Sequence, residues 1–520
     1  MSFRNGTLAL ALSLLVVLPA VKPQPVGAAT EAKPNIVFIM GDEIGWSNIG
    51  VYNQGLMAGK TPNLDRLANE GLRFTDYYAE STSTAGRANF LTGQLPLRSG
   101  LFSSVPIGSF QGIPDQAITL ATALRAQGYS TGQFGENAFG DRNLYLPTLH
   151  GFDEFFGYLY PLSVFEANYP ASLKDAIGPR NVVHSWATDV DDSNDQPRWG
   201  HIGRQKVEDA GALDAKRMET IDDEIVSQSV QFMDKCKKEE KPFFVWLNPS
   251  RMHAVTHLSA KYEAMRSAEN GWGVEEAGMA QLDDMVGTVM KYLKDGGMEQ
   301  NTVLVFASDS GPKPSAWPDG GQTPFAGGAG STLEGGFRAP CIVRWPGKVP
   351  AGKVENGIMS GLDWFPTFVS VAGDANIKDE LLQGKPVGAR NYKIHLDGYN
   401  QLDFLTAKAP SNRHEVCYFN RGSLEAMRFD DYKYRFNREK TSLTNLRLDP
   451  YERSSAGHDS SQNYPNWLRR ESWHFSLVQP MLVKFAQSVA EYPPMQKLPG
   501  LSADELRTRI LEKSSNLTVE

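Results

Sequence analysis

The feature that most constrains the fold is a pair of continuous apolar runs of strand length, each followed at once by acidic residues. Residues 35–40 (NIVFIM) precede Asp42 and Glu43, and residues 302–308 (TVLVFAS) precede Asp309. A strand that is apolar at every position is buried on both faces, which is typical of a parallel sheet covered by helices. Ligands of open α/β sheets bind beyond the carboxyl ends of such strands. The sequence therefore predicts a ligand site at these two strand ends.

Helix signals alternate with further strand-like runs along the first 390 residues. Residues 61–71 (TPNLDRLANEG) carry a Thr cap, a Pro at the first helical position and a Gly stop. The same alternation predicts helices at 118–128, 221–235 and 280–297, and strands at 129–134 and 241–249. We therefore expect an α/β fold in which a large mixed sheet is sandwiched by helices.

The pattern changes after about residue 390. Short β-prone segments separated by turn residues follow, among them EVCYF and DYKYRF, and residues 429–432 predict a hairpin. Residues 480–492 (PMLVKFAQSVAEY) predict a packing helix. The chain is accordingly divided into a main domain at 30–390 and a smaller antiparallel-sheet subdomain with a helical tail at 391–520.

The N-terminus has the form of a signal peptide. A basic residue, Arg4, precedes the apolar segment 7–21, and small residues at 27–29 offer a cleavage site. We therefore expect residues 1–29 to be removed and the mature protein to be exported, periplasmic or secreted, without a membrane anchor. An uncleaved anchor is the alternative.

Charge and cysteine content exclude several classes of function. The 520-residue chain carries a formal net charge of −8, which disfavours a nucleic-acid partner. Its three cysteines, Cys236, Cys341 and Cys417, lie far apart and form no CxxC motif. We expect buried structural thiols, not a disulfide scaffold or a zinc site.

Residues 81–93 (STSTAGRANFLTG) suggest an anion site. A helix is expected to begin near Gly86 or Arg87, just after Ser83, and a helix N-terminus presents free N–H groups to an anion. The guanidinium of Arg87 adds donors for an oxyanion. The alternative is that Ser83 is only a helix cap and Arg87 a surface residue.

The strand-end acids suggest a hard cation. Asp42, Glu43 and Asp309 supply carboxylate oxygens, and the hydroxyls of Ser83 and Ser310 can add more. Calcium prefers ligands of this kind. The alternative is that these acids cap helices or lie in solvent.

Several motifs, taken together and in order, resemble the sulfatase family of the alkaline-phosphatase superfamily, and arylsulfatases in particular. The similarity extends from about residue 34 to about residue 450. Ser83, Ala85 and Arg87, followed by Leu-Thr-Gly, fit the family signature. The other segments are NIVFIMGDEIGWSNIGVYNQG, KTPNLDRLANEGLRFTDYYAE, HGFDEFFGYLY, KPFFVWLNPSRMH and EGGFRAPCIVRWPG.

The resemblance implies a sulfatase-like fold, with 30–390 as the catalytic-type domain, and a defined chemistry. In this family a maturase oxidises the signature Cys or Ser, here Ser83, to formylglycine, whose hydrated form attacks the sulfur of a small sulfate ester. A calcium ion polarises the sulfate oxygens. Lysines and histidines neutralise charge and protonate the leaving oxygen.

The metal ligands depart from the family pattern. Asp42 matches the first aspartate after the opening strand, but Glu43 stands in place of the second. The later Asp-Asn pair is Asp309-Ser310 in this chain. The resemblance therefore implies a weakened calcium site.

The cationic groups depart further. The family element GKxHxG corresponds to GENAFG, so that Glu136 replaces the lysine and Ala138 the histidine. A second active-site lysine falls on Ala329. Of the expected polar groups that do not bind metal, His253 and Arg87 remain.

The substitutions make the expected pocket about three charge units more negative than in the family. We therefore expect hydrolysis of sulfate esters to be lost or severely impaired, which leaves binding of a small ligand as a role. One alternative is an active arylsulfatase that uses formylglycine made from Ser83 and has an altered specificity. A second is a phosphoesterase in which unmodified Ser83 is the nucleophile.

Overall fold

The computed structural model describes the chain from residue 32 to residue 515 except for four internal segments and one single residue. The described ranges are 32–170, 172–313, 320–436, 441–453, 463–496 and 503–515. The predicted signal peptide at 1–29 lies outside them. Contacts group Lys33–Glu520 into one unit, and the boundary at residue 390 stays a prediction from sequence.

The centre of the main sheet is parallel, as the apolar strands predict. Its five strands follow the spatial order β9, β1, β8, β4 and β5. They span Thr302–Ser308, Asn35–Gly41, Phe243–Asn248, Ser130–Glu136 and Glu154–Tyr158. Each of the predicted strands in this region is present, so the carboxyl ends of β1, β4 and β9 meet at one edge of the sheet.

Antiparallel strands extend this sheet at both edges to ten strands in all. On one side lie β10 (Cys341–Arg344), β2 (Leu72–Phe74) and β11 (Lys353–Glu355), of which β11 runs parallel to β2. On the other side lie β6 (Val183–Gln196) and β7 (Gly200–Asp209), a long hairpin that the sequence analysis did not predict.

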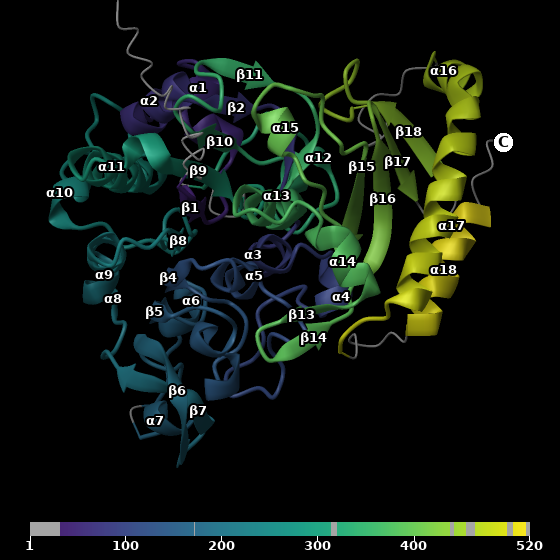
Figure 1. The fold of residues 1–520 in the computed structure, drawn as a ribbon. Coiled ribbons are helices and arrows are strands. Elements are labelled where there is room, and N and C mark those ends of the chain that lie inside the picture. Colours follow the sequence, from purple (N-terminus) through teal and green to yellow (C-terminus); the bar gives the residue numbers. More distant parts are fainter. Residues whose placement is uncertain are drawn as a thin grey trace, which may run out of the picture. The chain divides into compact units, whose positions relative to one another are not determined.

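Helices cover both faces of the sheet (Figure 1). Phe38 and Met40 of β1 belong to a core shared with α3, α5 and α13, whereas Val37 and Ile39 belong to a core shared with α2, α9 and α11. This alternation is why the strand is apolar at every position. The helices span Ser83–Thr92, Leu120–Ala126, Trp364–Val371, Pro62–Glu70, Ile221–Lys238 and Val274–Asp295 respectively.

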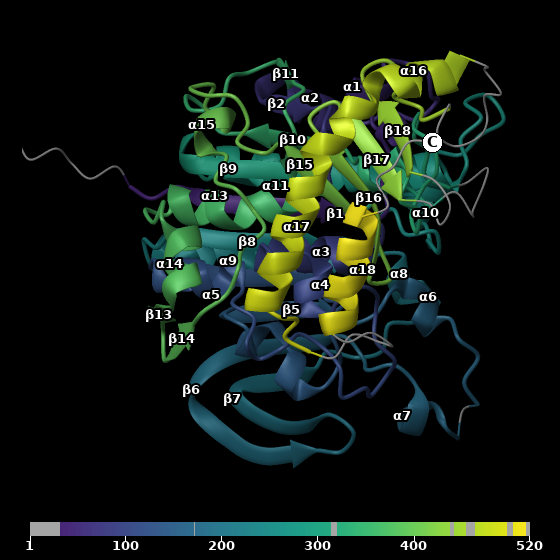
Figure 2. The same ribbon diagram turned by 90° about the vertical axis from the view of Figure 1, so that its right-hand side faces the viewer.

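The predicted C-terminal sheet is present and antiparallel. Its order is β15, β16, β17 and β18, and Phe429 pairs with Tyr432 across the predicted hairpin. The yellow helices α17 and α18 lie side by side against this sheet (Figures 1 and 2) and share an apolar core with it. These elements span Glu415–Asn420, Ser423–Phe429, Tyr432–Phe436, Thr441–Asn445, Phe475–Glu491 and Ala503–Ser515.

Shorter elements connect these layers. The strands are β3 (Tyr77–Tyr78), β12 (Met359–Ser360), β13 (Lys385–Val387) and β14 (Arg390–Tyr392). The helices are α1 (Gly50–Asn53), α4 (Pro96–Ser99), α6 (Leu162–Phe165), α7 (Lys174–Ile177), α8 (Ala215–Met218), α10 (Ala260–Glu263), α12 (Glu334–Phe337), α14 (Ile377–Gln383), α15 (Leu402–Leu405) and α16 (Asn463–Glu471). Among the described residues, no helix combines the length and apolarity needed to cross a bilayer.

All three cysteines are free thiols, and the prediction of buried thiols holds for two of them. Cys236 and Cys341 are buried and Cys417 is half-buried.

Candidate functional site

Three carboxylates meet at the carboxyl edge of the parallel strands. Asp42 follows β1, Glu136 ends β4 and Asp309 follows β9. Their exposed fractions are 1%, 2% and 1%. The apolar strands therefore carry these side chains into the interior, at the position where the sequence predicts a ligand site.

Helix α3 begins earlier than the sequence predicts. Its first residue is Ser83, and Thr82 is the N-cap, whose Oγ1 accepts a hydrogen bond of 3.4 Å from the Ala85 N–H. The prediction of a start near Gly86 or Arg87 is wrong because the extended backbone of Thr82 already supports a cap. The alternative that Ser83 itself is the cap is wrong for the same reason.

A close backbone contact fixes α3 onto the sheet. A Cβ atom on Gly86 would lie 1.8 Å from the carbonyl oxygen of Asp309. Only glycine therefore allows the helix to approach the end of β9 this closely. The contact carries the next residue, Arg87, among the strand-end carboxylates.

Arg87 is completely buried, with an exposed fraction of 0%, so its interpretation as a surface residue is wrong. Its Nη2 lies 3.0 Å from Asp309 Oδ2, 3.7 Å from Glu136 Oε2 and 3.8 Å from Asp42 Oδ1. Burial lowers the pKa of Arg87, but the carboxylates of Glu136, Asp309 and Asp42 outweigh this and raise it above its ordinary value. The guanidinium is therefore a permanent positive charge at the centre of the cluster.

Ser83 is half-buried and lies at the same edge of the sheet. Its hydroxyl donates a hydrogen bond of 3.0 Å to Asp42 Oδ1. The structure thus brings the signature serine together with Asp42, Arg87, Glu136 and Asp309.

Glu43 joins the cluster through a strained backbone. Its φ of 55° lies in the left-handed region, and its N–H donates a hydrogen bond of 3.1 Å to Asp309 Oδ1. The side chain is buried, and its Oε1 lies 3.7 Å from the Nζ of Lys313. The sequence analysis missed Lys313, because its partner Glu43 lies 270 positions away in the sequence and no local pattern pairs them.

The acidic residues raise one another's pKa. Burial raises the pKa of Glu136 and of Glu43 to about 8 each, and nearby carboxylates add to both effects. Burial and Asp42 together raise the pKa of Asp309 to about 7, against the opposing charge of Arg87. The four acidic groups therefore do not all stay ionised at neutral pH.

Comparisons with known proteins identify the family. A family model described as sulfatase matches residues 34–374. The chain belongs to the sulfatase family. Human arylsulfatase A is 30% identical over 454 residues, which cover 84% of this chain and 80% of the human protein.

Solved structures support the same family and the alkaline-phosphatase superfamily fold. The PsFucS1 sulfatase from Pseudoalteromonas sp. is 28% identical, with a TM-score of 0.72 over 89% of this chain and 91% of its own. The structure of Ps i-CgsB in complex with k-i-k-neocarrahexaose is 25% identical, with a TM-score of 0.67 over 93% of this chain and 98% of its own.

The sequence analysis matches Ala138 and Ala329 to a histidine and a lysine of the family pattern, and they follow two of the strand ends. Ala138 is buried, two residues beyond the end of β4. Ala329 is half-buried, and its N–H donates a hydrogen bond of 2.8 Å to the carbonyl oxygen of Pro312, in the loop that follows Asp309. Neither side chain supplies a proton or a charge.

His253 is buried in a segment tied to the first strand end. The N–H of Met252, its chain neighbour, donates a hydrogen bond of 3.0 Å to the carbonyl oxygen of Asp42. His253 Nδ1 accepts a hydrogen bond of 3.0 Å from the Val255 N–H, which leaves Nε2 as the proton-bearing nitrogen of the neutral ring. His257, four residues on, pairs with Glu166 instead.

Three of the oxygens that the sulfatase pattern gives to calcium have partners within the chain. Ser310 Oγ donates a hydrogen bond of 3.0 Å to the carbonyl oxygen of Gly311. Asp309 Oδ2 lies 3.0 Å from Arg87 Nη2, and Asp42 Oδ1 accepts a hydrogen bond from the Ser83 hydroxyl. Within the described part of the chain, no three His, Cys, Asp or Glu side chains are arranged to hold a metal ion.

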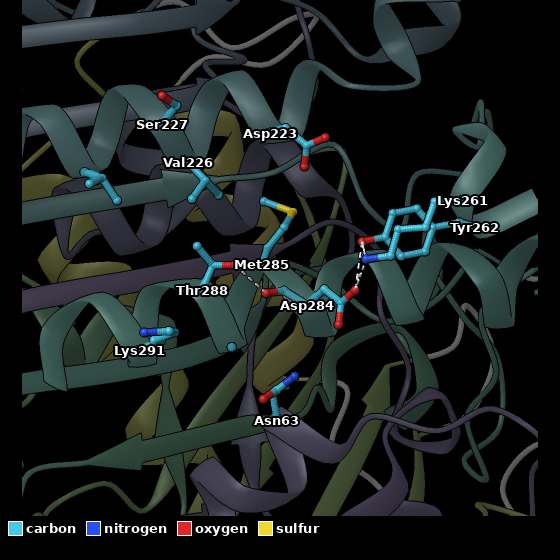
Figure 3. A pocket seen from close by; sticks show the side chains of 12 residues that line it. Asn63, Asp223, Val226, Ser227, Lys261, Tyr262, Asp284, Met285, Thr288 and Lys291 are labelled. Carbon is cyan, nitrogen blue, oxygen red and sulfur yellow. Dashed lines mark hydrogen bonds and ion pairs between the residues drawn. The ribbon is translucent and has the colours of Figure 1, made fainter. Parts of the chain in front are cut away.

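A separate hollow of about 650 Å³ lies between α9, α10 and α11. Lys261 and Tyr262 both point toward Asp284 and donate hydrogen bonds to it (Figure 3). None of its lining residues belongs to the strand-end cluster. We therefore place the candidate site at the strand ends and not in this hollow.

Proposed function

We propose that this protein keeps the sulfatase fold but has lost, or retains only severely impaired, sulfate-ester hydrolysis, and that it binds a small ligand instead. The observation that carries the proposal is Glu136. Its buried carboxylate lies 3.7 Å from Arg87, the cation that the family signature directs toward the anion. A sulfate group approaching Arg87 therefore meets a buried acidic side chain, with no positive charge, where the family pattern has a lysine.

The size of this effect supports a large loss of rate. One unit charge at 4 Å is worth roughly 4 kcal/mol at an effective dielectric constant of about 20. Replacement of a lysine by Glu136 removes one positive charge and, when Glu136 is ionised, adds a negative one. Replacement of a second lysine by Ala329 removes another positive charge. Because ~1.4 kcal/mol is tenfold in rate, a deficit of several kcal/mol corresponds to a loss on the order of a thousandfold or more.

The remaining positively charged side chains do not compensate for the missing lysines. Arg87 already faces three carboxylates, and Lys313 is paired with Glu43. His253 is the one family proton donor left at its position. A binding role for a small ligand, in an exported protein, is consistent with an intact scaffold and a depleted catalytic set, and the acidic cluster favours a cationic ligand over a sulfated one.

The direct test is turnover of aryl sulfates and sulfated sugars by protein made together with a formylglycine-generating maturase. We expect no turnover by the natural protein, and a gain on combining Glu136→Lys, Ala138→His and Ala329→Lys. Glu269→Lys, at an exposed position, is the matched control for the charge change. Turnover by the natural protein at the level of an active sulfatase matured in parallel would overturn the proposal.

A second candidate is an active sulfatase with altered specificity. The observation in its favour is Ser83 itself, which stands at the start of α3 with its hydroxyl 3.0 Å from Asp42 Oδ1. Formylglycine formation removes two hydrogens from Ser83. The mass of the tryptic peptide 74–87 from protein made in its native host or with a maturase decides this: a loss of two hydrogens favours an active sulfatase, and unmodified Ser83 eliminates formylglycine chemistry.

A further inference from the structure

A cavity of about 440 Å³, which we call the C-terminal cavity, lies between the main sheet region and the C-terminal sheet. Its walls come from α14, β15, β16, α17 and the segment that leads into α3. It shares no lining residue with the strand-end cluster. A cavity of this size accepts a small organic molecule.

Apolar side chains line a large part of the C-terminal cavity. They come from both sides of it and include Leu95, Leu362, Val416, Met427, Met481 and Phe485. Two of them are methionines, whose unbranched side chains adapt to the shape of a neighbour. The body of a ligand that fits this cavity is therefore apolar.

Two of the charged groups that line the cavity already have partners in the chain. Asp397 accepts hydrogen bonds of 2.8 and 2.9 Å from Nε and Nη2 of Arg98, and its Oδ1 lies 3.2 Å from His395 Nδ1. Arg413 donates hydrogen bonds of 2.9 and 2.7 Å to the two carboxylate oxygens of Asp363. Because such two-pronged pairs are strong, these groups have little affinity left for a ligand.

The two other acidic groups that line the cavity are Glu80 and Glu415. Burial raises the pKa of Glu80 to about 8, so that its carboxyl group is protonated and uncharged at neutral pH. Glu415 already accepts a hydrogen bond from the hydroxyl of Tyr399. Of these two acids, Glu415 alone brings a negative charge to the cavity at neutral pH.

Lys378 of α14 supplies a positive charge that the chain leaves without a counter-charge. Its Nζ donates a hydrogen bond of 2.7 Å to the carbonyl oxygen of Gly398, and it has two further protons to donate. Among the described residues, no carboxylate oxygen lies within ion-pair distance of it. Burial and the nearby Arg413 lower the pKa of Lys378, and an anion bound beside it would raise that pKa again.

Lys484 adds a second positive charge where the cavity reaches the surface. It is an exposed residue of α17 that lines the cavity. No described carboxylate lies within ion-pair distance of Lys484 either. The unpaired cations Lys378 and Lys484 therefore outnumber the negative charge of Glu415, and the polar end of a ligand that fits this cavity is an anion.

We propose that the C-terminal cavity binds a small apolar monocarboxylate, with its carboxylate at Lys378 and its apolar body against Met481 and Phe485. The site is separate from the strand ends where sulfatases carry out their chemistry. The proposal therefore does not depend on whether this protein hydrolyses sulfate esters.

The first experiment titrates the full natural protein calorimetrically at neutral pH with two carboxylates, decanoate and phenylbutyrate. Decanol and decylamine are the neutral and cationic probes of the same chain length as decanoate. We expect saturable binding of at least one carboxylate, and affinities about tenfold or more weaker for the alcohol and the amine, which form no ion pair with Lys378. Saturable binding of neither carboxylate, or equal affinity for decanoate, decanol and decylamine, would overturn the proposal.

The second experiment removes the cation with Lys378→Met. The variant should fold, because the lysine leaves no carboxylate behind, and we expect it to bind the carboxylate about tenfold or more weakly. Lys216→Met, at an exposed lysine outside the cavity, is the control and should bind normally. Undiminished affinity of a folded Lys378→Met protein would overturn the proposal. If this variant does not fold, Met481→Trp decides, because the indole fills part of the cavity and should also weaken binding.

A third variant separates the C-terminal cavity from the strand-end site. Glu136→Lys adds positive charge at the strand ends and changes nothing in the cavity, so its affinity for the carboxylate should equal that of the natural protein. A clear gain in affinity would assign the binding to the strand ends and overturn the proposal. Sulfate-ester turnover by the natural protein would overturn the proposed function and leave this site unaffected.

Discussion

At the scale of single residues, Glu80 shows how strongly burial acts on a lone carboxyl group. It is buried beside the strand-end site, and its Oε1 accepts a hydrogen bond of 3.3 Å from Asn89 Nδ2. No lysine, arginine or histidine of the described residues lies within ion-pair distance of it. Burial raises the pKa of Glu80 from 4.5 to about 8, against the hydrogen bond from Asn89. The folded protein therefore keeps this group protonated at neutral pH.

Replacement of Glu80 should change how stability depends on pH. In the unfolded chain Glu80 loses its proton near pH 4.5, whereas in the folded chain it does so near pH 8. The folded state thus binds more protons between these values, and the free energy of unfolding falls as pH rises through this window. Glu80→Gln should flatten that slope. Urea unfolding at several pH values measures it, with exposed Glu269→Gln as the control; an unchanged slope contradicts the prediction.

At the scale of elements, the contact between α3 and β9 decides whether Arg87 reaches the carboxylates. The tolerance for any added atom is small, because the opposing group at Gly86 is the backbone carbonyl of Asp309 and not a flexible side chain. Helix propensity alone favours alanine over glycine by about 1 kcal/mol. Steric exclusion should outweigh this preference.

Gly86→Ala should therefore destabilise the protein by about 1–3 kcal/mol, despite the better helix former. The measurement is equilibrium unfolding in urea. Gly59→Ala is a suitable control, because the nearest atom to its added Cβ is Glu276 Cγ, at 3.1 Å on a flexible side chain. Stabilisation by Gly86→Ala would show that α3 does not press on β9.

At the scale of the whole molecule, buried charges join the main sheet region to the C-terminal sheet. Lys433 of β17 is buried, and its Nζ lies 3.1 Å from Glu334 Oε1 and 2.9 Å from Glu452 Oε1. Tyr78 and Tyr418 each donate a hydrogen bond of 2.6 Å to Glu334. Burial opposes the ionisation of Glu334, but Lys433 and neighbouring arginines lower its pKa to about 2.

Removal of the lysine should loosen this connection. Lys433→Met leaves Glu334 and Glu452 buried without their shared cation, and breaking a buried pair in this way costs about 3–5 kcal/mol. We expect earlier unfolding in urea and faster proteolysis near the C-terminal sheet. Lys216→Met, at an exposed lysine paired with Glu219, is the control. Equal stability of the natural protein and Lys433→Met would contradict this prediction.

The ion pairs around Glu334 should also make the stability of the protein depend on pH in the acidic range. The folded-state pKa of Glu334 lies below its unfolded value of 4.5. Its stabilising contribution is therefore complete above about pH 4.5 and is lost as pH falls toward 2. Acid unfolding followed by circular dichroism should show a loss of stability in this window, and Glu334→Gln should remove part of it.

The sequence predicted the structural features that local residue patterns determine. It missed the features that depend on contacts between distant parts of the chain. Apolar strands ending in acids placed Asp42 and Asp309 at one sheet edge, because parallel strands share that edge. The start of α3 was misplaced, since Ser83 and Thr82 are both good cap residues and only the surrounding structure selects between them. The Glu43–Lys313 pair spans 270 positions, and nothing local indicates it. The polar hairpin of β6 and β7 lacks the apolar alternation that would have revealed it.

The close contact between Gly86 and the backbone of Asp309 affects how a match to the sulfatase signature should be interpreted. Gly86 and Arg87 hold a helix to the strand ends whatever the chemical state of Ser83, so both residues have a structural role that does not depend on hydrolysis. A sequence search for this signature therefore detects the fold at this edge of the sheet, and it does not by itself distinguish active from inactive proteins. A survey of such chains should sort them by the residue at the end of β4, where this protein carries Glu136.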